Sequence, residues 1–260
     1  MKRIMLTFLL TLGLAIGALA QEKPKTDPPA ATPEAKANAA MPTIDEILDR
    51  QIKSLGGKEA LEKITSRVVK GNFEIEGMNI TGTFENYAKA PNKTSNNVDI
   101  SGVGAFVQIF DGEKAWSSDP MNGQREITGN ELASTRREAE FYRELNLKKL
   151  FPKMELKGKE TVGTAEAYVV IATPEGGGDP EKFYFDATSF LLIRHDADRD
   201  SPQGKIGMET YFSDFKAVDG VKMAHQVRQV SPAFSLSLKF TEVKHNVEID
   251  NAKFNKPAAP

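Results

Sequence analysis

The hydrophobic pattern changes its period near Thr65, and this change constrains the fold more strongly than any other feature of the chain. Before this point apolar residues recur at helical spacing, whereas after it they alternate with polar residues over most of the remaining sequence. A period of two is typical of strands that bury one face. Turn signals such as Asp111-Gly112 and Asp219-Gly220 separate the alternating runs. The sequence therefore predicts a meander of antiparallel hairpins.

Helical patterns precede this meander and interrupt it once. Residues 44–55 begin at a capping box, in which Thr43 and Glu46 satisfy each other's backbone amides. Residues 58–64 predict a second, short helix, and residues 129–146 predict a third. A sheet with one apolar face must cover it, and these helices are too few to cover so many strands. We therefore predict a mainly β fold, an incomplete, half-open antiparallel β-barrel of about 11–12 strands with helices covering its mouth.

The start of the chain has the pattern of an export signal. A basic start, an apolar run and an Ala-Leu-Ala site ending at Ala20 predict a signal peptide over residues 1–20. A membrane anchor is the alternative, but the apolar run is short for a bilayer span. Residues 21–41 are rich in Pro and Ala and predict a disordered tether, and residues 42–260 predict one domain. We expect a periplasmic protein with no stable membrane span after signal cleavage.

Composition and motifs indicate a binding protein more than an enzyme. The formal net charge of -2 gives no attraction toward nucleic acid, and the chain contains no cysteine. His195, His225 and His245 are not spaced as ligands of one metal. The chain also lacks the glycine-rich and nucleophile motifs of common enzyme classes. We therefore expect no catalytic residue, no metal and no cofactor.

Three aspartates alternate in a short acidic run, at Asp196, Asp198 and Asp200. The run starts like a calcium-binding loop, but Ser201 and Gly207 stand where that loop needs its glycine and its glutamate. We therefore expect a solvated turn between strands at this place.

The apolar sides of the later strands predict a ligand cavity. Leu236 and Leu238 must face the same side, and Ser237 must face the other, because side chains alternate along a strand. The cavity hypothesis comprises Met78, Ile80, Phe84, Trp116, Tyr142, Ile206, Met208, Phe212, Val221, Met223, Phe234, Leu236, Leu238 and Phe240. Trp116, the only tryptophan, has two interpretations: it plugs the junction between the sheet and the 129–146 helix, or it lines the mouth of the cavity.

Several segments, taken in order, resemble a known family. They include LGGKEALEKI at 55–64, RVVKGNFEIEG at 67–77, IFDGEKAW at 109–116 and YFSDFKAVDGVKMAHQV at 211–227. Their order resembles the LolA/LolB/LppX-like superfamily of exported proteins, often described as outer-membrane lipoprotein-sorting-like. The resemblance implies a half-open barrel whose cavity binds acyl chains or another hydrophobic ligand.

The same resemblance raises the question of how the helices are held. It implies that carriers of the LolA type hold their lid through an arginine in an early strand, for which Arg67 and Arg125 are the positional candidates.

The leading functional hypothesis is a monomeric periplasmic carrier or binding protein for a lipid, a lipoprotein acyl chain or another hydrophobic ligand. One alternative is an envelope sensor or assembly partner that uses the same fold for contact with another protein. A further alternative is an enzyme acting on an envelope lipid or glycan, which would need clustered acids or a histidine–acid pair in the cavity.

Overall fold

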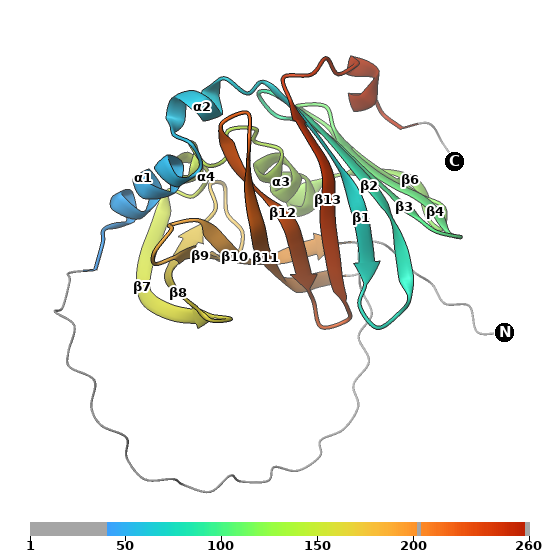
Figure 1. Cartoon of the computed structure of the whole chain (residues 1–260). Coiled ribbons are helices and arrows are strands. Elements are labelled where there is room, and N and C mark those ends of the chain that lie inside the picture. Colours follow the sequence, from blue (N-terminus) through green and yellow to red (C-terminus); the bar gives the residue numbers. More distant parts are fainter. Residues whose placement is uncertain (1–40, 202–203, 258–260) are drawn as a thin grey trace, which may run out of the picture.

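The computed structural model describes residues 41–201 and 204–257, which form one antiparallel sheet curled around a helix (Figure 1). The predicted signal peptide and most of the predicted tether fall within residues 1–40, outside the described residues. The strands are β1 (Ser66–Ile75), β2 (Ile80–Lys89), β3 (Lys93–Ile100), β4 (Gly104–Phe110), β5 (Ala115–Asp119), β6 (Gly123–Ile127), β7 (Lys153–Val162), β8 (Ala165–Thr173), β9 (Glu181–Asp186), β10 (Leu192–Ser201), β11 (Gly204–Val218), β12 (Val221–Val230) and β13 (Ser235–His245).

These thirteen strands of the described residues lie in the order β6-β5-β4-β3-β2-β1-β13-β12-β11-β10-β9-β8-β7. Every pair of neighbours is consecutive in the chain except β1 and β13, which pair antiparallel and join the two halves of the sheet. The sheet is not closed into a barrel, because β6 and β7 stand at its two ends. The predicted half-open antiparallel barrel is confirmed. Its strands exceed the expected 11–12 because every alternating run forms a strand of its own.

The helices are α1 (Ile44–Ser54), α2 (Lys58–Glu62), α3 (Gly129–Glu138), α4 (Leu147–Leu150) and a 3-10 turn, η1 (Asn251–Phe254). The capping box at Thr43 is present, with the amide of Glu46 donating to the threonine oxygen at 3.2 Å. The single helix expected over residues 129–146 is wrong. α3 ends at Glu138, and the carboxylate of Glu140 then accepts a hydrogen bond from the backbone amide of Tyr142 at 3.3 Å. This local acceptor favours a series of turns over a continuous helix.

α3 lies inside the curl of the sheet and contacts both of its halves (Figure 1). Leu132 of α3 and Ala139 pack against Phe110 at the end of β4. On the other side, Glu138 pairs with Arg199 of β10 at 2.6 Å. α3 therefore spans the opening between the edge strands β6 and β7.

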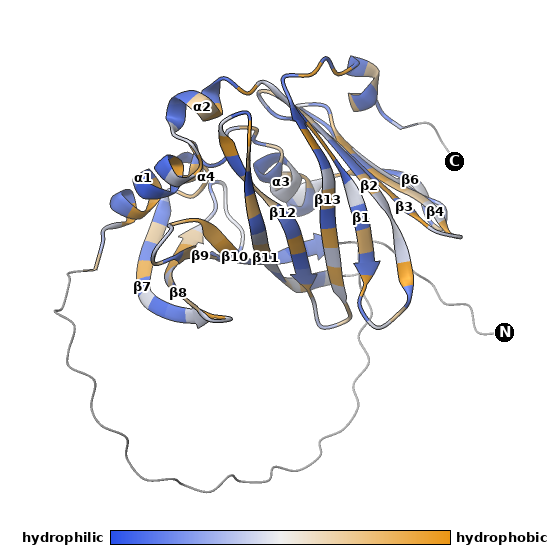
Figure 2. Cartoon of the chain, in the orientation of Figure 1, coloured by the Kyte–Doolittle hydropathy of each residue, from blue (hydrophilic) through white to orange (hydrophobic). Residues whose placement is uncertain are grey.

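The register places the apolar alternation of several strands on one concave face. Phe73 of β1 pairs with Leu238 of β13, which pairs with Val227 of β12, which in turn pairs with Phe212 of β11. Apolar and polar residues alternate along β1, β12 and β13 in Figure 2. Because directly paired residues point to the same side of a sheet, this row lies on the concave face with α3.

Aromatic rings and glycines fit together across β1 and β2. Phe84 is paired with Gly71, and a Cβ on Gly71 would lie 2.6 Å from the Phe84 ring. Phe73 is paired with Gly82 in the same way, and a Cβ there would also lie 2.6 Å from the ring. Each glycine leaves the space that its aromatic partner fills, so large rings pack flat on a strongly curved part of the sheet.

The segment after β13 covers part of the opposite, convex face. Phe254 packs against Val68 of β1, and η1 contacts β3. Farther along, the side chain of Gln124 on β6 donates a hydrogen bond to the backbone oxygen of Pro257. The segment therefore crosses β4 and β5 on the convex side. Trp116 of β5 lies on this side, since its neighbour Ala115 packs with α3.

Candidate ligand-binding cavity

Two neighbouring cavities lie between the concave face and the helices. Cavity A has a volume of about 270 Å³ and is lined by residues that include Leu55, Arg67, Phe212, Met223 and Phe240. Cavity B has a volume of about 350 Å³ and is lined by residues that include Phe84, Thr135, Met208, Phe234 and Leu238. Val227 of cavity A and Gln229 of cavity B are two residues apart on one face of β12, so the cavities adjoin.

Most of the residues in the cavity hypothesis are brought to these cavities. Those that line cavity A are Phe212, Val221, Met223 and Phe240. Those that line cavity B are Phe84, Met208, Phe234, Leu236 and Leu238. They come from β2, β11, β12 and β13 and from Phe234 just before β13, and the pairing of β1 with β13 brings β2 to the same face as the other three strands.

The remaining residues of the hypothesis lie elsewhere. Ile80 packs in the core cluster of Phe73, and Tyr142 packs beside cavity A in the cluster of Leu61. Ile206 is paired with Arg199 and is half-buried. These residues are not among those that line cavities A and B.

Met78 and Trp116 lie away from the concave cavities. Met78 is 49% exposed in the turn between β1 and β2, where alternation no longer determines direction. Trp116 is only 9% exposed, but it faces the convex side. The structure therefore places Trp116 neither at a junction with α3 nor at the mouth of the cavities. It lies where the C-terminal segment crosses the sheet.

A buried ionic cluster lies beside cavity A. Glu181 of β9 and His195 of β10 are 5% and 4% exposed, and His195 Nε2 lies 2.6 Å from a carboxylate oxygen of Glu181. Arg137 of α3 and Arg143, which follows it, lie 3.6 Å and 3.7 Å from the same carboxylate. The cluster thus connects α3 and residues 139–146 to β9 and β10.

Burial and pairing define the protonation of this cluster. Burial acts to raise the pKa of Glu181, but the hydrogen bond from His195 and the charges of Arg143 and Arg199 together hold that pKa below its usual value. Burial, the largest influence, lowers the pKa of His195, against the hydrogen bond to Glu181. Glu181 is therefore an anion and His195 a neutral imidazole that donates from Nε2.

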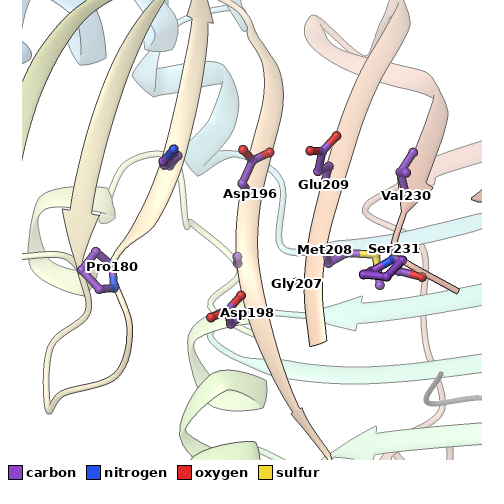
Figure 3. Close-up of a pocket in the computed structure, with 11 residues that line it drawn as sticks. Pro180, Asp196, Asp198, Gly207, Met208, Glu209, Val230 and Ser231 are labelled. Atoms are coloured by element: carbon purple, nitrogen blue, oxygen red, sulfur yellow. The ribbon is translucent and has the colours of Figure 1, made fainter. Parts of the chain in front are cut away.

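A separate hollow, of about 550 Å³, lies where β10 and β11 approach the loop after β12 (Figure 3). Asp196 and Glu209 stand side by side there, one on each strand. Arg194 binds both carboxylates, at 2.7 Å and 2.8 Å. The turn expected at Asp196–Asp200 is wrong, because β10 continues through Ser201 and pairs with β11. Its aspartates alternate with Ala197 and Arg199 as the polar side of a strand.

Comparisons with known proteins agree on the architecture. No family model matches the chain, and no curated protein matches its sequence. Solved structures do match: a DUF1329 family protein from Desulfovibrio piger has a TM-score of 0.54 at 15% identity, covering 82% of this chain and 97% of its own. A LolA superfamily protein from Nitrosomonas europaea has a TM-score of 0.54 at 12% identity, covering 83% and 99%. The fold is LolA-like.

A third similar structure is a putative outer membrane lipoprotein-sorting protein domain from Vibrio parahaemolyticus, with a TM-score of 0.52 at 12% identity over 82% of this chain and 97% of that one. At these identities the comparisons establish the fold alone. The resemblance to LolA-like proteins that the ordered sequence segments indicated is confirmed at that level.

The two positional candidates for a LolA-type arginine lie in different surroundings. Arg125 of β6 forms hydrogen bonds with both carboxylate oxygens of Glu131 at the start of α3. Arg67 of β1 lines cavity A, and its guanidinium carbon lies 5.3 Å from the centre of the Phe141 ring. Both arginines therefore contact the α3 region, Arg125 through an ion pair and Arg67 through an aromatic face.

His225 and His245 are separate from the buried cluster of Glu181 and His195. His245 lies 3.3 Å from the sulfur of Met223 and 3.4 Å from a carboxylate oxygen of Asp219. His225 lies 3.0 Å from the backbone oxygen of Met223. Within residues 41–201 and 204–257, no group of three or more His, Asp or Glu side chains is arranged to hold a metal ion.

The sequence did not lead us to predict the buried ionic cluster around Glu181. Glu181 and His195 were polar residues on predicted strands, yet they occupy inward positions beside Phe183. A charged residue in the apolar phase of a strand was the available signal. In the part of the chain that the structure describes, no helix has the length and apolar character needed to cross a membrane.

Proposed function

We propose that this chain is an exported carrier or binding protein that holds a lipid, a lipoprotein acyl chain or another hydrophobic ligand in cavities A and B. The observation that carries the proposal is the hollowed apolar concave face, where phenylalanine, leucine and methionine side chains from both halves of the sheet line the space between the sheet and the helices. The LolA-like fold, shared with a lipoprotein-sorting protein domain, supports the same function.

The energetics of such a site need no metal and no covalent chemistry. Each methylene moved from water into an apolar site contributes about 0.8 kcal/mol, so a chain of about ten methylenes offers about 8 kcal/mol before the costs of association. The usual range for small-molecule sites is about 300–1,000 Å³. Cavity B, at about 350 Å³, lies at the lower end of this range, and cavity A, at about 270 Å³, lies just below it. A single acyl chain running from one cavity into the other is the ligand shape that this geometry supports best.

The proposal is tested by native mass spectrometry of the chain purified from the periplasm, together with lipid extraction of the same sample. We expect an apolar molecule to co-purify and a fluorescent long-chain fatty acid or alcohol to bind to the delipidated protein. Absence of both a co-purifying lipid and any binding of the fluorescent probes would contradict the proposal.

The ionic attachment of α3 favours a second candidate, an envelope sensor or assembly partner. Two ion pairs, Arg137 with Glu181 and Arg199 with Glu138, hold α3 across the opening. A helix fixed in this way offers a rigid surface to which a protein partner can bind. Affinity purification from the native envelope separates the two functions. One stoichiometric protein partner with no bound lipid would favour the sensor.

An enzyme has less support, although a histidine–acid pair is present beside cavity A. His195 is 4% exposed, and its ring stacks on Phe183 with centroids 4.4 Å apart. Glu181 is held between Arg137 and Arg143. We propose that the pair holds the structure together, and a purified chain that leaves added phospholipids and acyl esters intact would agree with this assignment.

A further inference from the structure

Cavity A carries an arginine whose charge has no close counter-ion. Arg67 lies on the concave side of β1, where it is paired with Ala88 of β2 and His245 of β13. Its Nε is buried and has no hydrogen-bond partner, and no ion pair joins Arg67 to any carboxylate of the described residues. Its one close contact of electrostatic character is the face of Phe141.

The surroundings of Arg67 make this charge costly to leave alone. Burial lowers the pKa of Arg67, while the more distant charge of Glu144 acts in the opposite direction. An arginine side chain remains protonated in proteins, so the folded chain carries the free-energy cost of a desolvated guanidinium cation. An aromatic face offsets only part of that cost, about 2 kcal/mol for a desolvated cation. The site is therefore short of negative charge.

The remaining lining of cavity A also has fewer anionic than cationic side chains. Its charged side chains are the cations Arg67, Arg143 and Lys222 and the single carboxylate Glu144. His195, which also lines it, is neutral. Arg143 is already engaged with Glu181, which leaves Arg67 and Lys222. Of these two, Arg67 is the cation that has a buried donor without a hydrogen-bond partner. Most other lining side chains are apolar, including Leu55, Phe212, Val221, Met223 and Phe240.

We propose that cavity A binds the anionic head of a single-chain amphiphile, with a carboxylate or phosphate on Arg67 and the apolar chain running along β12 and β13 toward cavity B. The inference rests on the proposed function and names the ligand class. A planar guanidinium matches both anions, because it offers paired N–H donors. The volume of about 270 Å³ suits one chain better than a two-chain lipid.

Equilibrium dialysis of the delipidated full chain against matched ligands tests this assignment. The probes are tetradecanoic acid, tetradecyl phosphate and tetradecan-1-ol, which share one apolar chain and differ in the head. We expect at least one of the two anions to bind about tenfold more tightly than the alcohol, as a charge-assisted hydrogen bond implies. The tighter of the two anions identifies the head group.

Variants separate the charge of Arg67 from a packing role. Arg67→Met should bring the anion and the alcohol to within about twofold of each other, chiefly by weakening anion binding, and Arg67→Lys should keep part of the preference. The matched control is Arg228→Met, which removes an exposed arginine paired with Glu76 on the convex face and should keep the full preference. Removal of an unpaired buried charge should not unfold the chain, which circular dichroism verifies.

The outcomes divide clearly. Equal binding of anion and alcohol by the unmodified chain overturns the inference and leaves the proposed function standing. Retention of the full preference by Arg67→Met also overturns it. Failure of all three probes to bind would contradict the proposed function itself, and the inference with it.

Discussion

His195 donates a hydrogen bond to Glu181 over 2.6 Å, in an interior where both side chains are almost fully buried. The same carboxylate faces Arg137 of α3 and Arg143 of the segment that follows. One anion on β9 therefore fixes the helix that spans the opening of the sheet.

Glu181→Gln should lower the free energy of unfolding by about 2 kcal/mol or more, because it leaves two partly buried arginines without a counter-charge. Urea denaturation followed by circular dichroism measures the change. The matched control is Glu155→Gln, whose exposed carboxylate pairs with Lys157 and contributes less than about 1 kcal/mol. Equal effects of the two substitutions would show that the buried cluster does not hold α3.

The protein should lose stability in two steps as the pH falls. The pKa of His195 is lowered by burial, so below the ordinary value of about 6.5 the unfolded chain takes up a proton that the folded chain refuses. The pKa of Glu181 is also lowered, so its contribution is full above about 4.5 and is lost as the pH falls through its folded value.

Thermal unfolding measured between about pH 7.5 and pH 4 tests the first step. His195→Gln keeps a donor but cannot titrate, so its melting temperature should depend less on pH just below about 6.5. The unmodified chain, measured over the same pH range, is the reference. An unchanged profile in His195→Gln would assign the step to another group.

Leu238→Asp should reduce both stability and ligand uptake. Leu238 lines cavity B and pairs with Phe73, so the new carboxylate would lie in an apolar site at a cost of about 2 kcal/mol. Ser237→Asp places the same carboxylate on the convex face, near both Arg228 and Glu76. Because these two charges act on it in opposite directions at an exposed site, stability should change by less than about 1 kcal/mol. Denaturation and fatty-acid binding measure both effects. A more damaging Ser237→Asp would reverse the assignment of the two faces.

Gly71→Ala should destabilise the sheet by about 1–3 kcal/mol, because the added methyl would collide with the Phe84 ring and the backbone oxygen of Lys239. Gly207→Ala is the control, since its nearest neighbour is a carboxylate oxygen of Asp198 at 3.5 Å. That substitution should be neutral or slightly stabilising. Chemical denaturation of the two variants compares them directly, and similar midpoints would argue against tight packing of Phe84 over Gly71.

The emission of Trp116 should respond to the C-terminal segment and not to ligands. Trp116 faces the convex side and is 9% exposed, whereas cavities A and B lie on the concave side. Removal of the residues from Asn251 onward should shift its fluorescence to longer wavelength, because water reaches the indole. Saturation of the full chain with a fatty acid should leave the emission maximum in place. A large shift on ligand binding would place the ligand near Trp116.

The local alternation of the sequence predicts much of this fold. Strands such as β13 appear with their inward residues, since Leu236 and Leu238 are two positions apart and must share a face. The capping box at Thr43 likewise depends on residues within one helical turn, so the start of α1 is predictable. Signals of this kind need no knowledge of what lies across the sheet.

Other features depend on segments that meet only in the folded chain. The pairing of β1 with β13 brings Phe73 to Leu238, and no local pattern specifies that neighbour. The segment after β13 reaches Gln124 of β6 on the convex side, more than a hundred residues away in sequence, and no local pattern specifies that contact.

By itself, the sequence determined which residues form strands and which side of each strand is apolar, because alternation is set by neighbouring positions in one chain segment. Only the tertiary structure decided that Glu181, His195 and Arg137 would share one buried site and that Arg67 would face cavity A without a counter-ion. The physical reason is that the cost of a buried charge depends on partners contributed by distant segments, and those partners exist only after the sheet has curled around α3.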